Sequence, residues 1–130
     1  MILTDIKNTL TLIAGAKPAT ITASRNGSAI DIRGYLGSIM AVLYAAKGTG
    51  NADNTLDTKI QTSADGSTGW ADVTGATFTQ VLGTGGTDSL QGINVEVRLC
   101  ERYIRFVDTV AGTSPSYVLS QHVIGQKATT

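Results

Sequence analysis

The sequence predicts an all-β fold built from short antiparallel strands, arranged as a sandwich or a barrel. Apolar and polar residues alternate in short runs, and clusters of Gly, Asn, Asp and Ser separate these runs. Successive side chains of a strand point to opposite faces, so this pattern is typical of strands with one face on a core. No long segment has a convincing 3.6-residue period, which argues against a helical fold. A chain of 130 residues fits one domain with one core.

The clearest strand is predicted at residues 93–99, where Ile93 and Val95 would point to one face and Asn94 to the other. The same alternation predicts a strand at residues 56–61. Eight or nine strands are expected in total, at about the spacing of a sandwich or barrel. The predicted ranges are 9–14, 20–23, 29–32, 38–45, 56–61, 77–82, 93–99, 103–110 and 117–124.

Two segments allow more than one interpretation. Residues 38–46, SIMAVLYAA, are apolar on both faces of the predicted strand. A central strand covered on both sides explains this pattern and is the favoured interpretation, but an outer face buried against another subunit also explains it. Residues 1–12 are ambiguous because Ile2, Ile6 and Leu10 could line one face of a short helix.

The charge balance and the cysteine content limit the possible partners and compartments. Ten Lys and Arg balance ten Asp and Glu, so we expect neither a nucleic acid nor an anionic membrane as partner. Charged residues make up only 15% of the chain, and a surface with few charges associates readily, which suits a protein that lives within an assembly. The single Cys100 excludes an internal disulfide, and residues 1–20 are too polar for a signal peptide or membrane span. Synthesis and residence in a reducing cytosol are therefore expected.

Residues that could bind a metal or attack a substrate do not form a recognisable constellation. The side chains with suitable spacing for calcium lack the glycine and terminal glutamate of a calcium loop; they are Asn51, Asp53, Asn54 and Asp57. The only histidine, His122, is predicted to face solvent from a strand, and Cys100 has no matched histidine motif. No nucleophile elbow of the form Gly-x-Ser-x-Gly is present. We therefore predict no catalytic, cofactor-binding or metal site, and no small-molecule substrate.

Three further groups of residues favour structural interpretations. Nothing in the sequence fixes the separation of Asp65, Asp72 and Asp88, on which glycosidase chemistry depends. The glycine-rich segment 83–86 is not followed by the Lys-Ser or Lys-Thr of a phosphate-binding loop. Arginines alternate with acidic residues in a self-neutralising arrangement typical of a solvated sheet face: Arg98, Arg102 and Arg105 with Glu96, Glu101 and Asp108.

The segment IQTSADGSTGWADV at residues 60–73 could form a hairpin or a sugar-binding site. Asp65-Gly66 between two alternating runs favours a hairpin, with Trp70 at the start of the returning strand. The alternative is based on a resemblance to the Asp-box turn of sialidase propellers, with Trp70, Tyr35 and Tyr44 as candidate rings for sugar stacking. Aromatic residues make up only 5% of the chain and the turn occurs once, so the hairpin is favoured.

Three segments taken in order resemble a family of small virion proteins of tailed bacteriophages. They are ITASRNGSAIDIRGYLGS at 21–38, LDTKIQTSADGSTGWADV at 56–73 and RYIRFVDTVAGTSPSYVLSQHVIG at 102–125. Members of the family typically have "ITA..NG.AVDLRGY.G", "KLQESDDGSTWTDV" and "RYVRV", and the resemblance spans about residues 10–125. The departures are the extra Gly69 before Trp70, Ala64 in place of an acidic residue, and the longer loop at 83–89.

The resemblance implies a single antiparallel β-sandwich, jelly-roll-like, of about eight strands, with an N-terminal arm at residues 1–8 and the sandwich at 9–130. Some such proteins are capsid decoration or cement proteins, often trimers across the junctions of capsid subunits. The implied function is therefore structural rather than enzymatic: a head decoration protein, made in the bacterial cytoplasm and bound to the major capsid protein on the capsid surface. The implied oligomer is a homotrimer.

The candidate contacts are the arm at residues 1–8 for the capsid, and the apolar strand residues Ile39, Val42 and Tyr44 for self-association. Two other functions stay open. One is a tail or head-to-tail component of the virion, because a sandwich does not fix the location. The other is a carbohydrate-binding module displayed on the particle.

Overall fold

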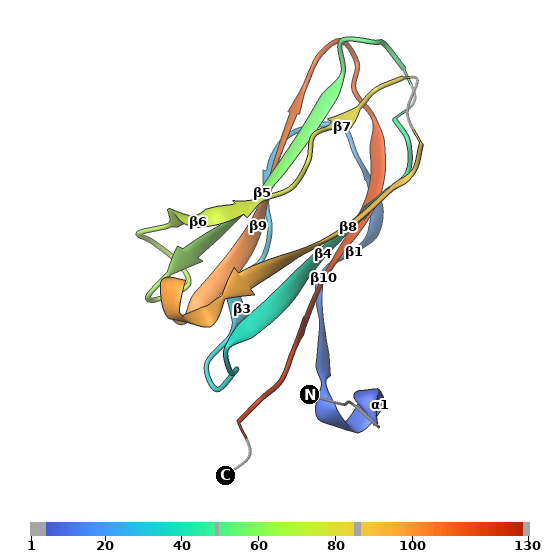
Figure 1. The fold of residues 1–130 in the computed structure, drawn as a ribbon. Helices are drawn as coiled ribbons and strands as arrows, with labels where there is room; N and C mark the ends of the chain where they lie inside the picture. Colours follow the sequence, from blue (N-terminus) through green and yellow to red (C-terminus); the bar gives the residue numbers. More distant parts are fainter. Residues whose placement is uncertain (1–4, 49, 85–86, 129–130) are drawn as a thin grey trace.

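Two antiparallel sheets pack face to face in the computed structural model, which describes residues 5–48, 50–84 and 87–128 (Figure 1). One sheet has the strand order β1-β10-β4-β8. The other has the order β2-β9-β5-β6, with β3 also paired to β9 and β7 also paired to β5. The elements are α1 (Ile6–Thr9), β1 (Thr11–Ile21), β2 (Arg25–Asn26), β3 (Ile30–Asp31), β4 (Ser38–Ala45), β5 (Thr55–Ser63), β6 (Ala71–Thr77), β7 (Val81–Leu82), β8 (Ser89–Glu96), the 3-10 turn Val97–Leu99, β9 (Tyr103–Ala111) and β10 (Tyr117–Gly125).

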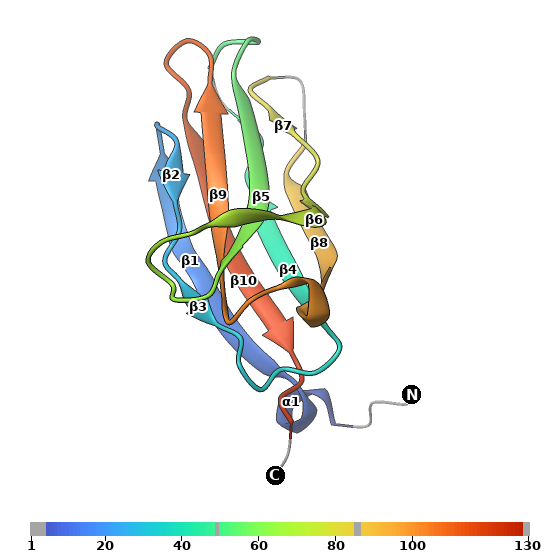
Figure 2. The same ribbon diagram turned by 90° about the vertical axis from the view of Figure 1, so that its left-hand side faces the viewer.

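The strand pairs are nested along the chain, which is the topology of a jelly roll. The first strand pairs with the last, β2 and β3 pair with β9, β4 pairs with β8, and β5 pairs with β6 and β7. The short strands β2 and β3 share one position beside β9, and β6 and β7 share one position beside β5. The described strands therefore fill eight positions. Figure 2 shows the sheet that contains β9 and β5 in front of the sheet that contains β10 and β4, with α1 at one end. The predicted all-β, jelly-roll-like sandwich of about eight strands is confirmed.

The inward faces of the two sheets form one core. In β5, Leu56, Thr58 and Ile60 are buried while Asp57 is exposed, as the alternation predicts. The rings of Phe78 and Phe106 stack with their centroids 6.2 Å apart. Each large apolar side chain that is removed from water in this way stabilises the fold by about 1.5–3 kcal/mol.

The two strands predicted at 9–14 and 20–23 are one strand, β1, so this division was wrong. The residues between the two predicted ranges include Gly15 and Pro18, and both fit an irregular edge strand. The register against β10 shifts between Ala14 and Ala16 and again before Ala19. A Cβ at Gly15 would lie 2.6 Å from the ring of Phe106, so only glycine fits there. Pro18 is tolerated because β1 is at the edge of its sheet.

The strand predicted at 93–99 ends at Glu96, and Val97–Leu99 form a 3-10 turn. The backbone N–H of Val97 donates to the carbonyl of Gly37, and that of Cys100 donates back to Val97, which closes the turn. Leu99 is therefore exposed instead of continuing the inward row. The strand predicted at 77–82 is likewise divided between the end of β6 and the short β7.

The favoured interpretation of residues 38–46 as an interior strand covered on both faces was wrong. Ile39, Ala41, Leu43 and Ala45 are buried, but Met40 and Tyr44 are exposed on the other face of β4. Ile39 is only 1% exposed, so it belongs to the core and cannot be a contact residue for self-association.

The N-terminal segment contains only one described helical turn, α1, whose side chains are not buried. The Asp5 carboxylate caps it by accepting hydrogen bonds from the backbone and side-chain amides of Asn8. Ile6 is exposed, and the predicted position at Ile2 lies outside the described residues. Within the described residues, no helix is long and apolar enough to cross a membrane.

A carboxylate is buried between the two sheets. Asp108 of β9 is 1% exposed, and its Oδ1 accepts hydrogen bonds of 2.7 Å from Thr58 Oγ1 and from Gln121 Nε2. Its Oδ2 accepts from Arg25 Nε at 2.8 Å. Since Gln121 belongs to one sheet and the other three residues to the opposite sheet, this cluster ties the layers together. Asp108 is therefore not part of the self-neutralising surface that the sequence predicted.

We predict that Asp108→Ala lowers the free energy of unfolding by about 3 kcal/mol or more, since it leaves the buried donors of Thr58 and Gln121 and the half-buried Arg25 without their acceptor. The exposed Asp57, which accepts from Gln80, provides the control. We expect Asp57→Ala to change stability by less than about 0.5 kcal/mol. Urea denaturation followed by tryptophan fluorescence measures both, and equal losses for the two variants would contradict the assigned role of Asp108.

Candidate interaction surfaces

The four-stranded sheet exposes an apolar surface on the side away from the core, called the outer face below. Its large exposed apolar side chains are Leu12, Met40, Tyr44, Leu90 and Val118. The strand register adds outward positions that are smaller, polar or partly covered: Ala14, Thr20, Ser38, Val42, Gly92, Asn94, Glu96, Ser120, His122 and Ile124. Among these paired positions, Glu96 at the end of β8 is the only Asp, Glu, Lys or Arg. A contiguous face of this kind is characteristic of a surface that contacts another protein.

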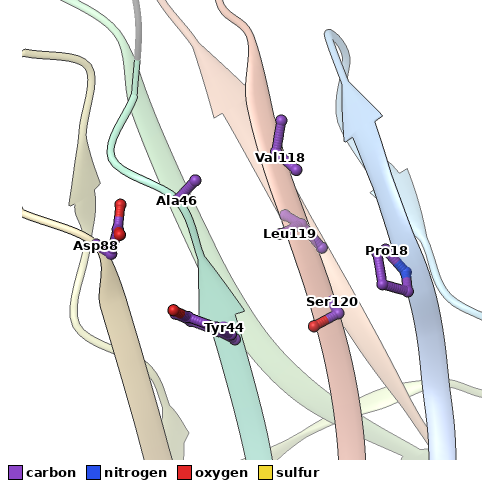
Figure 3. A pocket seen from close by; sticks show the side chains of 7 residues that line it. All are labelled: Pro18, Tyr44, Ala46, Asp88, Val118, Leu119 and Ser120. Atoms are coloured by element: carbon purple, nitrogen blue, oxygen red, sulfur yellow. The ribbon is translucent and has the colours of Figure 1, made fainter.

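A hollow of about 290 Å³ indents the outer face where Ser120 lies between Pro18 and Tyr44 (Figure 3). Ala46, Asp88, Val118 and Leu119 complete its lining. The hollow arises because the small Ser120 sits between larger neighbours on the adjoining strands. It is mostly apolar, so it suits an apolar side chain better than a charged ligand.

The predicted hairpin is present, but its turn is longer than a tight Asp-Gly turn. Residues 64–70 connect β5 to β6, and Trp70 lies just before the returning strand instead of within it. Asp65 organises the turn by accepting hydrogen bonds from the backbone N–H groups of Thr68 and Ser67, and from the hydroxyls of Thr68 and Ser63. These donors, the Thr68 N–H first, hold the pKa of the Asp65 carboxyl far below its usual range.

The three candidate rings for sugar stacking do not form a platform. Trp70 lies on the six-stranded sheet, where the Arg105 guanidinium covers one face of its ring, 4.3 Å from the centroid. Tyr44 lies on the outer face of the other sheet, and Tyr35 is buried. The geometry therefore offers a sugar one partly covered ring, not the several aligned rings that a stacking site needs.

The candidate metal ligands do not converge in the described residues, where no three His, Cys, Asp or Glu side chains could together hold a metal ion. Asn51 donates to the carbonyl of Thr113, and Asp53 accepts from the hydroxyl of the same residue. Asn54 is fully buried, whereas Asp57 accepts from Gln80. Each side chain thus has its own structural surroundings.

The remaining candidate residues also have separate partners. Asp72 pairs with Lys59 at 2.9 Å, and Asp88 accepts from the backbone N–H of Lys47. Burial raises the pKa of the Cys100 thiol, which disfavours the nucleophilic thiolate. Each arginine of the predicted cluster has its own neighbour: Arg98 with Glu96, Arg102 with Asp31, and Arg105 with Gln61. The glycine-rich segment 83–86 lies partly outside the described residues.

The candidate self-association strand keeps two of its three predicted residues, Val42 and Tyr44, on the outer face. Sequence reasoning missed Leu12, Leu90 and Val118, which the register brings beside them. A usable signal was present for β10, because its outward residues Val118 and Ile124 are apolar in a strand whose other face is apolar except for Gln121. Leu90 carried no such signal, since it precedes the predicted range 93–99.

Comparison with known proteins shows what fold the chain shares. No family model matches it, and no curated protein matches its sequence. Solved structures do match. The structure of infectious bursal disease virus, Gx strain, matches at 15% identity and a TM-score of 0.59, over 91% of this chain and 32% of that chain. The VP2 subviral particle of infectious bursal disease virus matches at 16% identity and a TM-score of 0.58, over 91% of this chain and 32% of that chain. Dimeric latent PorU from Porphyromonas gingivalis matches at 9% identity and a TM-score of 0.53, over 92% and 12%.

The chain spans about a third of the viral chains that it matches. At these identities the likeness shows the fold: a β-sandwich of a kind that also occurs in viral capsid proteins.

The Asp65 turn gives a testable pH dependence. The folded pKa is below the unfolded one, so the carboxylate stabilises the fold at neutral pH, and this contribution is lost as the pH falls through the folded pKa. We predict that Asp65→Asn has a lower denaturation midpoint than the wild type at pH 7, and that the difference shrinks between about pH 4 and pH 2. Urea titrations across this range measure it. A difference that stays constant with pH would show that the ionised carboxylate does not hold the turn.

Proposed function

We propose that the chain is a structural, non-enzymatic protein of a tailed-bacteriophage particle, and specifically a head decoration protein that binds the major capsid protein on the capsid surface. The observation that carries this proposal is the outer face, an apolar surface with a single charged paired position on a two-layer sandwich. Such a surface serves an assembly better than it serves catalysis. The ordered motifs at 21–38, 56–73 and 102–125 support the choice of a phage virion among possible assemblies.

A decoration protein needs no site chemistry, only a rigid body that presents several weak contacts at once. The segment before β1 is a candidate for the capsid contact, because α1 exposes Ile6 and buries none of its own side chains in the sandwich. Contacts of this kind add up when many copies bind neighbouring capsid subunits. The homotrimer implied by the sequence resemblance stays a prediction.

The decisive experiment mixes the purified protein with phage capsids that lack it and sediments the particles. We expect the protein to sediment with capsids and to occur in purified virions, where negative-stain images of a tagged copy would locate it on the head. Label on the tail or connector would favour the head-to-tail alternative. A protein that neither binds capsids nor occurs in particles would overturn the proposal.

Deletion of residues 1–8 tests the arm. Since the described part of this segment contributes no buried side chain, we predict an unchanged urea midpoint together with loss of most capsid binding in the same sedimentation assay. Full binding by the deletion variant would assign the capsid contact to another surface.

The carbohydrate-binding alternative depends on Trp70. It would gain support if a glycan array showed dose-dependent binding that Trp70→Ala abolished, with Tyr44→Ala as a control ring on the opposite sheet.

A further inference from the structure

The outer face is large enough to form a specific contact. Four strands about 4.8 Å apart and about eight residues long give a footprint of about 500 Å². Two such faces together would bury about 1,000 Å² or somewhat more, since side chains roughen the surface. This is the lower limit for a specific protein interface, so a contact made through the face alone would be reversible.

The composition of the face suits pairing with an identical copy. Where a face meets itself about a two-fold axis, a charged position near the axis is brought close to its own copy, and such like-charge contacts are unfavourable. Glu96, at the end of the edge strand β8, is the only Asp, Glu, Lys or Arg among the register-paired positions of the outer face, so self-pairing of the rest of the face meets no such penalty. The scarcity of charges also offers little to select a strongly charged partner.

The shape of the face is also self-complementary along one row of the sheet. The register aligns Leu90 of β8 with Tyr44 of β4, and Tyr44 with Ser120 of β10. Pro18 of β1 continues the row, because it lines the hollow beside Ser120; it lies with Lys17 in the bulged segment between the positions that pair with Gln121 and Leu119. The row therefore has the large side chains of Leu90 and Tyr44 on one half and the hollow above Ser120 on the other half. Figure 3 shows Tyr44, Ser120 and Pro18 of this row.

A two-fold axis that runs along the strands, between β4 and β10, would place the large half of this row over the hollow half of the second copy. Tyr44 would then cover the small Ser120 of the other copy, and Leu90 would lie over its Pro18. Leu90 is 68% exposed, so it projects far enough to fill such a hollow. The next row brings the small Gly92 opposite Ala14, which permits close approach of the two sheets.

We propose that the outer face packs against the same face of a second copy of this chain about this two-fold axis, with Tyr44 and Leu90 of each copy filling the hollow of the other. Such a contact is isologous and closes as a dimer, in contrast to the trimer that the sequence resemblance implies. The dimer concerns the free protein, goes beyond the proposed function and does not depend on it.

Sedimentation velocity of the full chain over about 1–200 µM tests the dimer. We expect a monomer–dimer equilibrium with a dissociation constant in the micromolar range, about 1–100 µM, as the modest area implies. Leu90→Asp buries a charge without a partner and should raise the dissociation constant at least about tenfold. The matched control is Leu82→Asp, because Leu82 is 51% exposed but belongs to β7 in the opposite sheet. It should leave the dimer unchanged, and both variants should keep the wild-type urea midpoint.

Cross-linking tests the orientation. Single variants Leu90→Cys and Pro18→Cys, each in a Cys100→Ser background, are mixed and treated with a short bis-maleimide. We expect a cross-linked dimer in the mixture and little in Leu90→Cys alone, because the proposed axis puts the two Leu90 positions at opposite edges of the interface, about 14 Å apart across the strands.

Three outcomes would overturn the dimer: a monomer throughout the concentration range, a trimer, or a dimer that Leu90→Asp does not weaken. A monomer whose capsid binding is abolished by Leu90→Asp would assign the outer face to the capsid protein instead. Equal cross-linking of Leu90→Cys with itself would overturn the proposed axis. If Leu90→Asp loses the dimer but still sediments with capsids, the dimer contact and the capsid contact are separate, and the proposed function stands.

Discussion

The strict alternation of side chains along each strand is the constraint on which the rest of this structure depends. In a two-layer sandwich, one face of every strand packs on the core, and the other face must meet water or another protein. A shift of one residue in register would exchange the two faces, so the core residues of β4, such as Leu43, fix the outward position of Tyr44. The packing of the core thus determines which residues form the outer face. The apolar character of these residues is unusual, because the exposed face of an antiparallel sheet is commonly polar.

The buried Asp108 shows how the same alternation can place a charge where apolar packing would serve. Ile104, Phe106 and Asp108 are successive inward residues of β9, and only the last is polar. Arg25 supplies the opposite charge, while Thr58 and Gln121 supply further donors from both layers. Because hydrogen bonds are directional and hydrophobic contacts are not, this cluster favours one relative placement of the sheets over others. A rigid, single arrangement of two layers is useful in a protein that must present fixed surfaces to an assembly.

The sequence predicted the elements whose alternation is regular and missed the features set by contacts distant in the chain. The range 38–45 coincides with β4, and 103–110 and 117–124 each fall one residue short of β9 and β10. In contrast, Val97 leaves its strand because its backbone N–H bonds to Gly37, a contact that local pattern does not reveal. The interpretation of β4 as an interior strand failed for a related reason. An apolar pattern on both faces of a strand does not show whether the second face is covered by the same chain.

The proposed structural function depends on the outer face. In the described residues, the candidate carboxylates and arginines have separate neighbours, and each supports a local turn or strand pair. A reversible self-contact of limited area would be inadequate for a protein that acts alone in dilute solution. It becomes effective on a regular lattice, where a second contact holds each copy in place and the effective concentration of its neighbours is high. Weak self-pairing also limits association before the lattice exists, so the assembly itself would determine when the apolar faces become covered.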